Sequence, residues 1–466
     1  MKYYFLGICG TAMASLAILL KQKGHEVWGT DQNIYPPMSN LLRENQIEVW
    51  EGYDKKHLEK PFDITVIGNA LTRGNPEIET LLNNRHRFAS LPEIIRYEFA
   101  LPKESIVITG THGKTTTTAL MSWMLEANNL SPTFLIGGVA QNFQTSARIG
   151  NGKYFVIEGD EYDCAFFDKR PKFIHYLPNY LIINNIEFDH ADIYQDINQI
   201  KDGFHKLIRT LPENGLIIAN GDDPNVRDVL REVYTPVTYF GKNSENDWHF
   251  GKTEGALNSN SFKVLFHSAE PVDFHLPYQG EHQIYNALSV IVLAKHLGIS
   301  HDQIQQAFDS FQGVKRRLEL WGELYGGLIY DDFAHHPTAI EKTLQALRRN
   351  HPDKKILAIF EPRTNTSVRN IFQRELIQAL AVADISIILP LYRIDRISPE
   401  NRLSISQVEE KLKQKGRDIY ILTDYQKLRS LLAKILNKNV IGCILTNGNL
   451  GGEYEKLYDE ILKNRK

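Results

Sequence analysis

Cysteine is scarce in this sequence, and its three cysteines, Cys9, Cys164 and Cys443, lie far apart. An odd number of widely spaced cysteines argues against a disulfide framework and favours a reducing compartment. Each one fits a small buried thiol. The sequence also lacks the run of about 20 apolar residues that a membrane-spanning helix requires. We therefore expect a soluble, cytoplasmic protein.

An excess of charge of one sign is also missing. The 53 basic and 56 acidic residues are mixed along the chain and give a formal net charge of -3. Without an extended positive field, we expect no binding to nucleic acid or to an anionic membrane surface. The 466 residues exceed what one hydrophobic core usually serves, so several domains are expected.

What the sequence does contain is a regular alternation of short apolar strands and amphipathic helices, which predicts an α/β fold. One βαβ unit opens the chain, a second begins near Leu101 with the strand SIVITG, and a third begins near Val314. We predict three domains with the bounds 1–101, 102–313 and 314–466. Polar turns between residues 239 and 274 predict an antiparallel insertion in the second domain.

The strongest local signal is the segment IVITGTHGKTTTTAL, residues 106–120. It predicts a strand, a tight turn with Gly110 and Gly113, and a helix whose N-terminus favours a polyphosphate. Lys114 would reach the β- and γ-phosphates of a nucleotide, and the Thr115 hydroxyl would bind Mg²⁺. Only two residues separate the glycines, whereas the usual P-loop has four, so this is a variant loop.

Acidic residues follow two further apolar strands. FVIEGDEYD and NNIEFDHADIY place carboxylates and one histidine at strand ends, where Mg²⁺ beside a phosphate would find oxygen ligands. These residues are Glu158, Asp160, Glu161, Asp163, Asp189, His190 and Asp192. A solvated acidic turn is the alternative for any single member, and a lone His190 would more often be structural.

Three other segments allow more than one interpretation. In GVKRRLELWGE one guanidinium would clamp a phosphate, unless the turn is merely solvated. YDDFAHHPT contains two aspartates and two histidines. A zinc site is not favoured, because no further Cys or His lies at a suitable spacing. GICGTAM matches a dinucleotide-binding loop only in part, with Asp31 in a position to reach a ribose. Taken alone, this N-terminal unit is also compatible with a nicotinamide-dependent dehydrogenase.

Six motifs, GTHGKTTTT, IEGDE, NNIEFDHAD, GEHQIYNALSV, RRLEL and YDDFAHHPTAI, resemble the Mur ligase family of ATP-dependent amide-forming enzymes in order and spacing. The resemblance covers essentially the whole chain. It implies a Rossmann-like N-terminal domain for a UDP-sugar, a central P-loop ATPase domain, and a Rossmann-like C-terminal domain. The last would close over ATP and present the amine substrate.

Within the family, GICGTAM, YPPMSNLL, GNALTRGNPEIE and DEYDCAFFDKRPKF resemble members that act on UDP-N-acetylmuramate. Those members join it to the murein tripeptide L-alanyl-γ-D-glutamyl-meso-diaminopimelate. Members that add free L-alanine to the same sugar nucleotide are the alternative. A protein of another functional class, a non-catalytic sensor that binds ATP and a UDP-sugar, is a further alternative.

The resemblance also implies the residues of each site. For catalysis these are Lys114, Glu158 and His190, with Mg²⁺ on Thr115, Glu158 and His190. For ATP they are Gly110, Thr111, His112, Gly113, Lys114, Thr115, Thr116, Asn286, Arg317, Asp332 and His336. For the UDP-sugar they are Gly10, Thr11, Met13, Asp31, Asn69 and Thr72.

For the peptide, the sequence itself offers a candidate. The strand KKILAIF ends in EPRTNTS, which predicts Arg363 and Asn365 at the edge of the third sheet that faces the cleft. A guanidinium suits a terminal carboxylate. An exposed cation or a structural ion pair is the alternative for Arg363.

Two positions depart from the family pattern. Gln283 stands where many relatives have asparagine in the adenine-side motif, which puts that contact in doubt. Phe204 stands where relatives that add the second or third amino acid have a carbamylated lysine. Lys201 and Lys206 flank Phe204, but on a helix they would point elsewhere. We therefore expect no carbamate in this protein.

Overall fold

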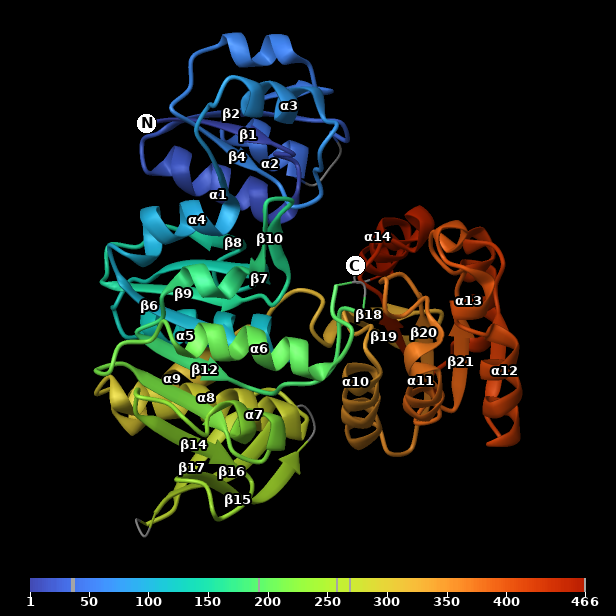
Figure 1. Ribbon diagram of the computed structural model, residues 1–466. Coiled ribbons are helices and arrows are strands. Elements are labelled where there is room, and N and C mark those ends of the chain that lie inside the picture. The colour runs from blue at the N-terminus through green and yellow to red at the C-terminus, as the bar shows by residue number, and fades with distance from the viewer. Residues whose placement is uncertain (35–37, 192, 257–258, 268–269, 465–466) are drawn as a thin grey trace.

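The computed structural model describes residues 1–34, 38–191, 193–256, 259–267 and 270–464. Figure 1 shows the N-terminal unit stacked above the central unit, with the C-terminal unit beside the central one. All three are α/β units, so the predicted fold class is confirmed. None of the described helices combines the length and the apolar character that crossing a membrane requires.

The N-terminal unit has a parallel five-stranded sheet in the order β3-β2-β1-β4-β5. Its strands are β1 (Lys2–Leu6), β2 (Glu26–Asp31), β3 (Glu48–Glu51), β4 (Ile64–Ile67) and β5 (Phe88–Ser90). Its helices are α1 (Thr11–Gln22), α2 (Met38–Glu44), α3 (Pro76–Asn83) and α4 (Leu91–Ile95). Strands β1, β2, β4 and β5 are largely buried, as is usual for a parallel sheet covered by helices, whereas the edge strand β3 is partly exposed.

The central unit is built on a ten-stranded sheet in the order β17-β16-β15-β14-β13-β12-β6-β9-β7-β8. Its strands are β6 (Glu104–Thr109), β7 (Thr133–Ala140), β8 (Thr145–Arg148), β9 (Tyr154–Gly159), β12 (Tyr180–Ile183), β13 (Leu216–Asn220), β14 (Val237–Gly241), β15 (Trp248–Ala256), β16 (Ser259–Phe266) and β17 (Val272–Leu276). Its helices are α5 (Lys114–Ala127), α6 (Ile197–Ile208), α7 (Pro224–Val229), α8 (Glu281–His296) and α9 (His301–Ser310). The central strands are parallel, so the residues that follow β6, β9 and β12 meet at one edge.

The antiparallel insertion predicted for residues 239–274 is present but begins later. Strands β15, β16 and β17 pair antiparallel. Residues 237–241 instead form β14, which extends the parallel sheet by pairing with β13. Two hairpins were not predicted: β7 with β8, and the separate pair β10 (Asp163–Ala165) and β11 (Asp168–Pro171). Strands β8, β10 and β11 have only three or four residues, and β7 contains Gly137 and Gly138, so the alternation signal is weak.

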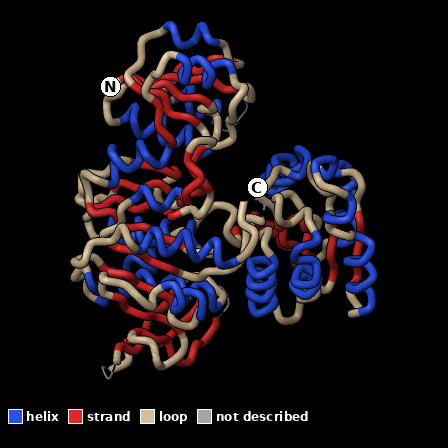
Figure 2. Tube along the Cα trace, viewed as in Figure 1, coloured by secondary structure: helices blue, strands red, loops and turns tan. Residues whose placement is uncertain are grey.

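The C-terminal unit has a six-stranded sheet in the order β18-β19-β23-β20-β21-β22, antiparallel only between β18 and β19. Its strands are β18 (Glu319–Leu324), β19 (Gly327–Asp332), β20 (Lys355–Phe360), β21 (Ile385–Ile388), β22 (Asp418–Ile421) and β23 (Val440–Leu445). Its helices are α10 (Pro337–Asn350), α11 (Gln373–Leu380), α12 (Ile405–Gln414), α13 (Leu428–Ile435) and α14 (Glu453–Asn464). Two separate apolar clusters cover the two faces, and Figure 2 shows helices around these strands.

Candidate functional site

The turn between β6 and α5 can be built only with glycine at two positions. Gly110 has φ 130° and Gly113 has φ 83°, both in the region that favours glycine. A Cβ on Gly110 would lie 3.0 Å from the backbone of Asn185, and one on Gly113 would lie 2.5 Å from Oδ1 of Asn286. The turn therefore lies directly against the loop after β12 and the start of α8.

Lys114 begins α5 and is held by a buried carboxylate. Its Nζ donates to the carbonyl oxygen of Gly110 (2.7 Å) and to Oε2 of Glu161 (2.8 Å). Burial alone would lower the pKa of Lys114, but the carboxylates of Glu161 and Asp160 outweigh burial and raise it. The Lys114 side chain is therefore a fixed cation at the N-terminus of this helix.

Glu161 also connects Lys114 to His190. Oε1 of Glu161 lies 3.1 Å from Nε2 of His190, and Tyr194 donates to the Glu161 backbone carbonyl (2.6 Å). Burial would lower the pKa of His190, but the hydrogen bond to Glu161 raises it. Asp160, Glu161 and His190 bring their ligand atoms within 4.8 Å of one another, a spacing that a metal ion could bridge.

Thr115 and Glu158 form a second group beside the first. The Thr115 hydroxyl donates to Oε2 of Glu158 (3.0 Å) and accepts from Nη2 of Arg317 (3.0 Å), which comes from the C-terminal unit. Oε1 of Glu158 is buried without a hydrogen-bond partner among the described residues. Burial raises the pKa of Glu158. An orphaned, desolvated carboxylate oxygen is what a divalent cation would satisfy.

The three predicted metal residues thus lie at two neighbouring places, because Thr115 bonds to Glu158 whereas His190 bonds to Glu161. Thr115, Glu158 and His190 all line one cavity of about 510 Å³. Thr11 of the N-terminal unit and Thr366 of the C-terminal unit line the same cavity. This cavity, which we call the central cavity, is therefore bordered by all three units. Asp192 lies outside the described residues.

A second cavity of about 550 Å³ opens on the other side of the turn, and we call it the nucleotide cavity. Seven of the residues predicted to bind ATP line it, namely His112, Gly113, Thr115, Thr116, Asn286, Arg317 and Asp332. Thr111, Lys114 and His336 line the central cavity instead. The turn therefore borders both cavities, and His112, Gly113, Thr115 and Arg317 line both of them.

Two polar residues shape the wall of the nucleotide cavity. Nδ2 of Asn286 donates to Oε1 of Gln283 (3.3 Å), so the glutamine that departs from the family pattern still lies beside Asn286. Asp332 accepts hydrogen bonds from the backbone N–H groups of Leu318 (2.7 Å) and Ala334 (2.8 Å). Burial raises the pKa of Asp332.

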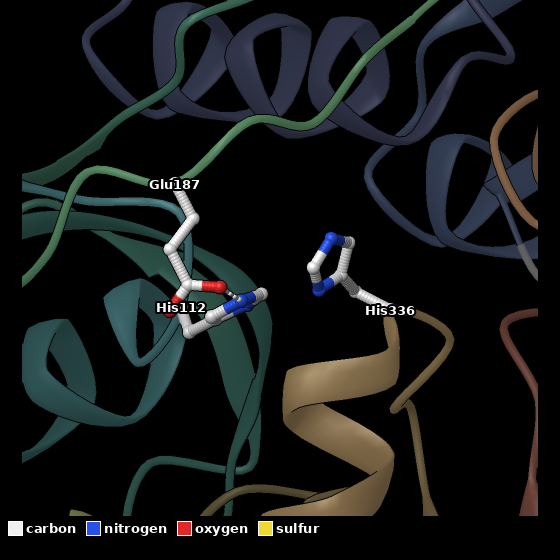
Figure 3. A group of neighbouring side chains, drawn as sticks. All are labelled: His112, Glu187 and His336. Atoms are coloured by element: carbon white, nitrogen blue, oxygen red, sulfur yellow. Dashed lines mark hydrogen bonds and ion pairs between the residues drawn. The ribbon is translucent and has the colours of Figure 1, made fainter. Parts of the chain in front are cut away.

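His336 caps α10, and its ring centroid lies 4.9 Å from that of His112. Burial, and after it the charge of His112, lowers the pKa of His336 to about 4. Figure 3 shows Glu187 beside His112 and facing His336. Sequence reasoning missed Glu187, although its motif NNIEFDHAD was singled out; its position directly after an apolar strand was the available signal.

The six residues predicted for the UDP-sugar lie mostly at the carboxyl ends of the first sheet, but they do not share one cavity. Gly10 caps α1, Met13 is buried in α1, and Thr72 is exposed. Asp31 accepts from the backbone N–H of Cys9 (2.9 Å) and of Asn33 (3.0 Å). Both carboxylate oxygens of Asp31 therefore already have donors.

Asn69 links this region to the central unit. Its Nδ2 donates to Oδ1 of Asp163, 2.8 Å away, at the start of β10. Phe167 at the tip of the same hairpin packs against Phe88 of the N-terminal unit, with ring centroids 5.0 Å apart. The unpredicted hairpin thus fixes the N-terminal unit beside the central one.

Arg363 follows β20, as predicted, and is held from two sides. Its guanidinium lies 4.0 Å from the ring centroid of Tyr392, and Nη1 lies 3.4 Å from Oε1 of the fully buried Glu361. Glu361 also accepts from the hydroxyls of Tyr425 (2.9 Å) and Thr446. Thr364 and Thr366, on either side of Asn365, line the central cavity.

The remaining sequence predictions concern Phe204 and the cysteines. Phe204 is buried, with its ring 5.2 Å from that of Phe173. Lys201 pairs with Asp228 (3.0 Å), and Lys206 is exposed. Cys9, Cys164 and Cys443 are free thiols, and burial raises the pKa of all three.

Comparison with known proteins gives concordant matches along the whole chain. Residues 2–97 match the catalytic domain of the Mur ligase family, 108–294 the Mur ligase middle domain, and 316–449 the Mur ligase glutamate ligase domain. Over 98% of each chain, the sequence is 39% identical to the UDP-N-acetylmuramate:L-alanyl-gamma-D-glutamyl-meso-2,6-diaminoheptandioate ligase of Haemophilus influenzae.

Two further relatives bear on the choice of amine. The crystal structure of a murein peptide ligase from Psychrobacter arcticus matches with a TM-score of 0.74 and 34% identity, over 99% of this chain and 98% of that one. The UDP-N-acetylmuramate:L-alanine ligase of Caldicellulosiruptor bescii is 32% identical over 99% of this chain and 98% of that protein. The identity to the tripeptide-adding relative is thus the higher.

Proposed function

This chain belongs to the Mur ligase family, and from that premise we propose that it joins UDP-N-acetylmuramate to the tripeptide L-alanyl-γ-D-glutamyl-meso-diaminopimelate. It is an ATP-dependent ligase that forms a carbon–nitrogen bond. The observation that carries the proposal is the central cavity. Residues from all three units line it, so a sugar nucleotide, ATP and an amine can meet there.

The reaction needs ATP because a carboxylate is a poor electrophile for an amine. The γ-phosphoryl group of ATP moves to the lactyl carboxylate of UDP-N-acetylmuramate and gives an acyl phosphate. The amine of the tripeptide's alanine attacks the acyl carbon, and phosphate leaves from the tetrahedral intermediate. The protein mainly positions the reactants and offsets their charge.

Lys114 has the central part in this scheme. Its side chain lines the central cavity, and its ammonium, held by Glu161, would face the transferring phosphoryl group. Gly110, Thr111, His112, Gly113, Thr115, Thr116, Asn286, Arg317, Asp332 and His336 complete the proposed ATP site. Arg317 and His336 belong to the C-terminal unit, so ATP binding favours contact between the two units.

Mg²⁺ would be held by Thr115 and Glu158 at one position and by His190 with Glu161 at another. The orphaned Oε1 of Glu158 supports this assignment, because a buried carboxylate oxygen without a donor favours a cation. Bound there, the metal would neutralise charge on the phosphates. Glu158 would supply oxygen ligands and His190 a nitrogen ligand, and both side chains line the central cavity.

The other substrates are assigned by position. Gly10, Thr11, Met13, Asp31, Asn69 and Thr72 are proposed for UDP-N-acetylmuramate, and Arg363 and Asn365 for the diaminopimelate end of the tripeptide. The proposed domains span residues 1–101, 102–313 and 314–466. We also propose a cytoplasmic location, since ATP and UDP-sugars are made and used there, and no nucleic-acid or membrane partner.

The test is the dependence of ATP hydrolysis on the other substrates. A ligase releases ADP and phosphate only when UDP-N-acetylmuramate and the tripeptide are both present, and its product has the mass of the two joined with loss of water. A sensor would bind ATP and the sugar nucleotide without turnover. Phosphate release that is indifferent to the amine would contradict the proposal.

A further inference from the structure

Residues 187–189, which follow β12, form a strip that contacts the C-terminal unit at every position. Oε2 of Glu187 accepts a hydrogen bond from Oγ1 of Thr338, 2.7 Å away. Oδ1 of Asp189 accepts one from Oγ1 of Thr366, 3.2 Å away. Three consecutive residues of the central unit thus lie against separate segments of its neighbour.

The middle contact of the strip is apolar. The ring of Phe188 lies 5.9 Å from that of Phe372, which in turn lies 4.9 Å from the ring of His336. Phe188 and Phe372 thus make a direct aromatic contact between the two units.

The same carboxylate oxygens also bind residues of the active site. Oε2 of Glu187 lies 3.3 Å from Nε2 of His112 in the P-loop, as Figure 3 shows. Oδ1 of Asp189 accepts from the backbone N–H of His190 (2.7 Å), which is held at φ 56°. A single oxygen atom thus links Thr338 to His112, and another links Thr366 to His190.

The strip is also fixed to the turn that holds Lys114. The backbone N–H of Glu187 donates to Oγ1 of Thr111 (2.8 Å), and Oγ1 of Thr111 lies 3.2 Å from the Glu187 carbonyl oxygen. Burial would raise the pKa of Glu187, but the hydrogen bonds from His112 and Thr338 lower it to about 2. Glu187 is therefore ionised at neutral pH, and charged acceptors form the stronger hydrogen bonds.

We propose that Thr338 and Thr366 are positioning residues, which act through Glu187 on His112 and through Asp189 on His190. Contact of the C-terminal unit then sets the P-loop and the metal-side histidine in their working positions. The proposal rests on the function proposed above for the same site.

The variant Thr338→Val removes the donor and keeps the side-chain shape, whereas Thr338→Ser keeps the donor. Loss of one hydrogen bond to a charged group corresponds to roughly a tenfold to hundredfold effect. We expect Thr338→Val to lower kcat by that factor with the KM for UDP-N-acetylmuramate unchanged, and Thr338→Ser to stay near wild type. In a Glu187→Met background, which has no oxygen to accept this hydrogen bond, Thr338→Val should cost much less. Thr366→Val should lower kcat in the same way.

Small-angle scattering on the same proteins supplies a readout that needs no turnover. We expect a larger radius of gyration for Thr338→Val combined with Thr366→Val than for wild type. Equal kcat for Thr338→Val and Thr338→Ser, an undiminished effect in the Glu187→Met background, or an unchanged radius of gyration would each overturn the proposal. Absence of turnover in the wild type would count against the proposed function. Scattering would still show whether residues 187–189 hold the C-terminal unit in contact with the central unit.

Discussion

The Lys114 ammonium lies 2.8 Å from the Glu161 carboxylate, at the turn assigned to ATP. Their side chains are only 16% and 5% exposed, so the pair is largely removed from water. A bound polyphosphate would share this cation with Glu161. The pair therefore keeps Lys114 oriented and charged before the nucleotide arrives.

Replacing Lys114 by alanine should reduce turnover about a hundredfold to a thousandfold or more, because it removes the cation that offsets charge on the transferring phosphoryl group. The ADP-release assay measures this. The fold should persist, although Glu161 loses a partner, and breaking a buried pair costs roughly 3 kcal/mol. Lys114→Ala with Glu161→Gln is the matched control, since it should recover stability without recovering turnover. Near-normal phosphate release by folded Lys114→Ala would refute this role.

Activity should not depend on dissolved carbon dioxide. Phe204 is buried where some relatives would have a carbamylated lysine, Lys201 is paired with Asp228, and Lys206 is exposed. Turnover in carbon-dioxide-free buffer should equal that in bicarbonate buffer. A carbamate found on Lys201 or Lys206 by intact mass or in density would contradict this.

Arg363→Ala should weaken use of the tripeptide by about 1.5 to 3 kcal/mol, the usual range for a hydrogen bond to a charged group. Binding of ATP and UDP-N-acetylmuramate should stay near normal. Tyr392 and Glu361 hold the Arg363 guanidinium in place, and a planar guanidinium suits a carboxylate. Arg363→Lys keeps the positive charge but lacks the paired N–H donors of a guanidinium. It should therefore recover only part of the lost tripeptide use. An unchanged KM for the tripeptide would assign Arg363 to structure alone.

Acidification should destabilise the protein in part through His336. Its pKa falls from 6.5 to about 4 on folding, because the neutral ring is buried. The unfolded chain therefore binds the proton first, so stability is lost as pH falls from 6.5 toward 4. The difference between pH 7 and pH 5 is about 2 kcal/mol. His336→Asn keeps a helix cap, and its melting temperature should fall less than that of the wild type between pH 7 and pH 5. Equal falls in the two proteins would count against this role of His336.

The strand–turn–helix around Gly110, Gly113 and Lys114 was predictable because it is encoded in consecutive residues. The partners of these residues were not. Glu161 is 47 positions from Lys114, and Thr338 is 151 from Glu187. Such contacts depend on how the sheets and units pack, which local periodicity does not specify.

The same limit applies to Arg363 and to the hairpins. Glu361 is two residues away in the same motif, but Tyr392 comes from a separate loop. The β10–β11 hairpin has strands of three and four residues, too short for a period to be recognised. Its contact between Asp163 and Asn69 joins two units, so only the folded chain reveals it.

The choice of amine is the most direct test of the account. The measurement is kcat/KM for the tripeptide and for free L-alanine, with saturating ATP and UDP-N-acetylmuramate, followed by phosphate release and confirmed by product mass. We expect the tripeptide to be by far the better substrate. Equal or better use of free L-alanine would contradict it.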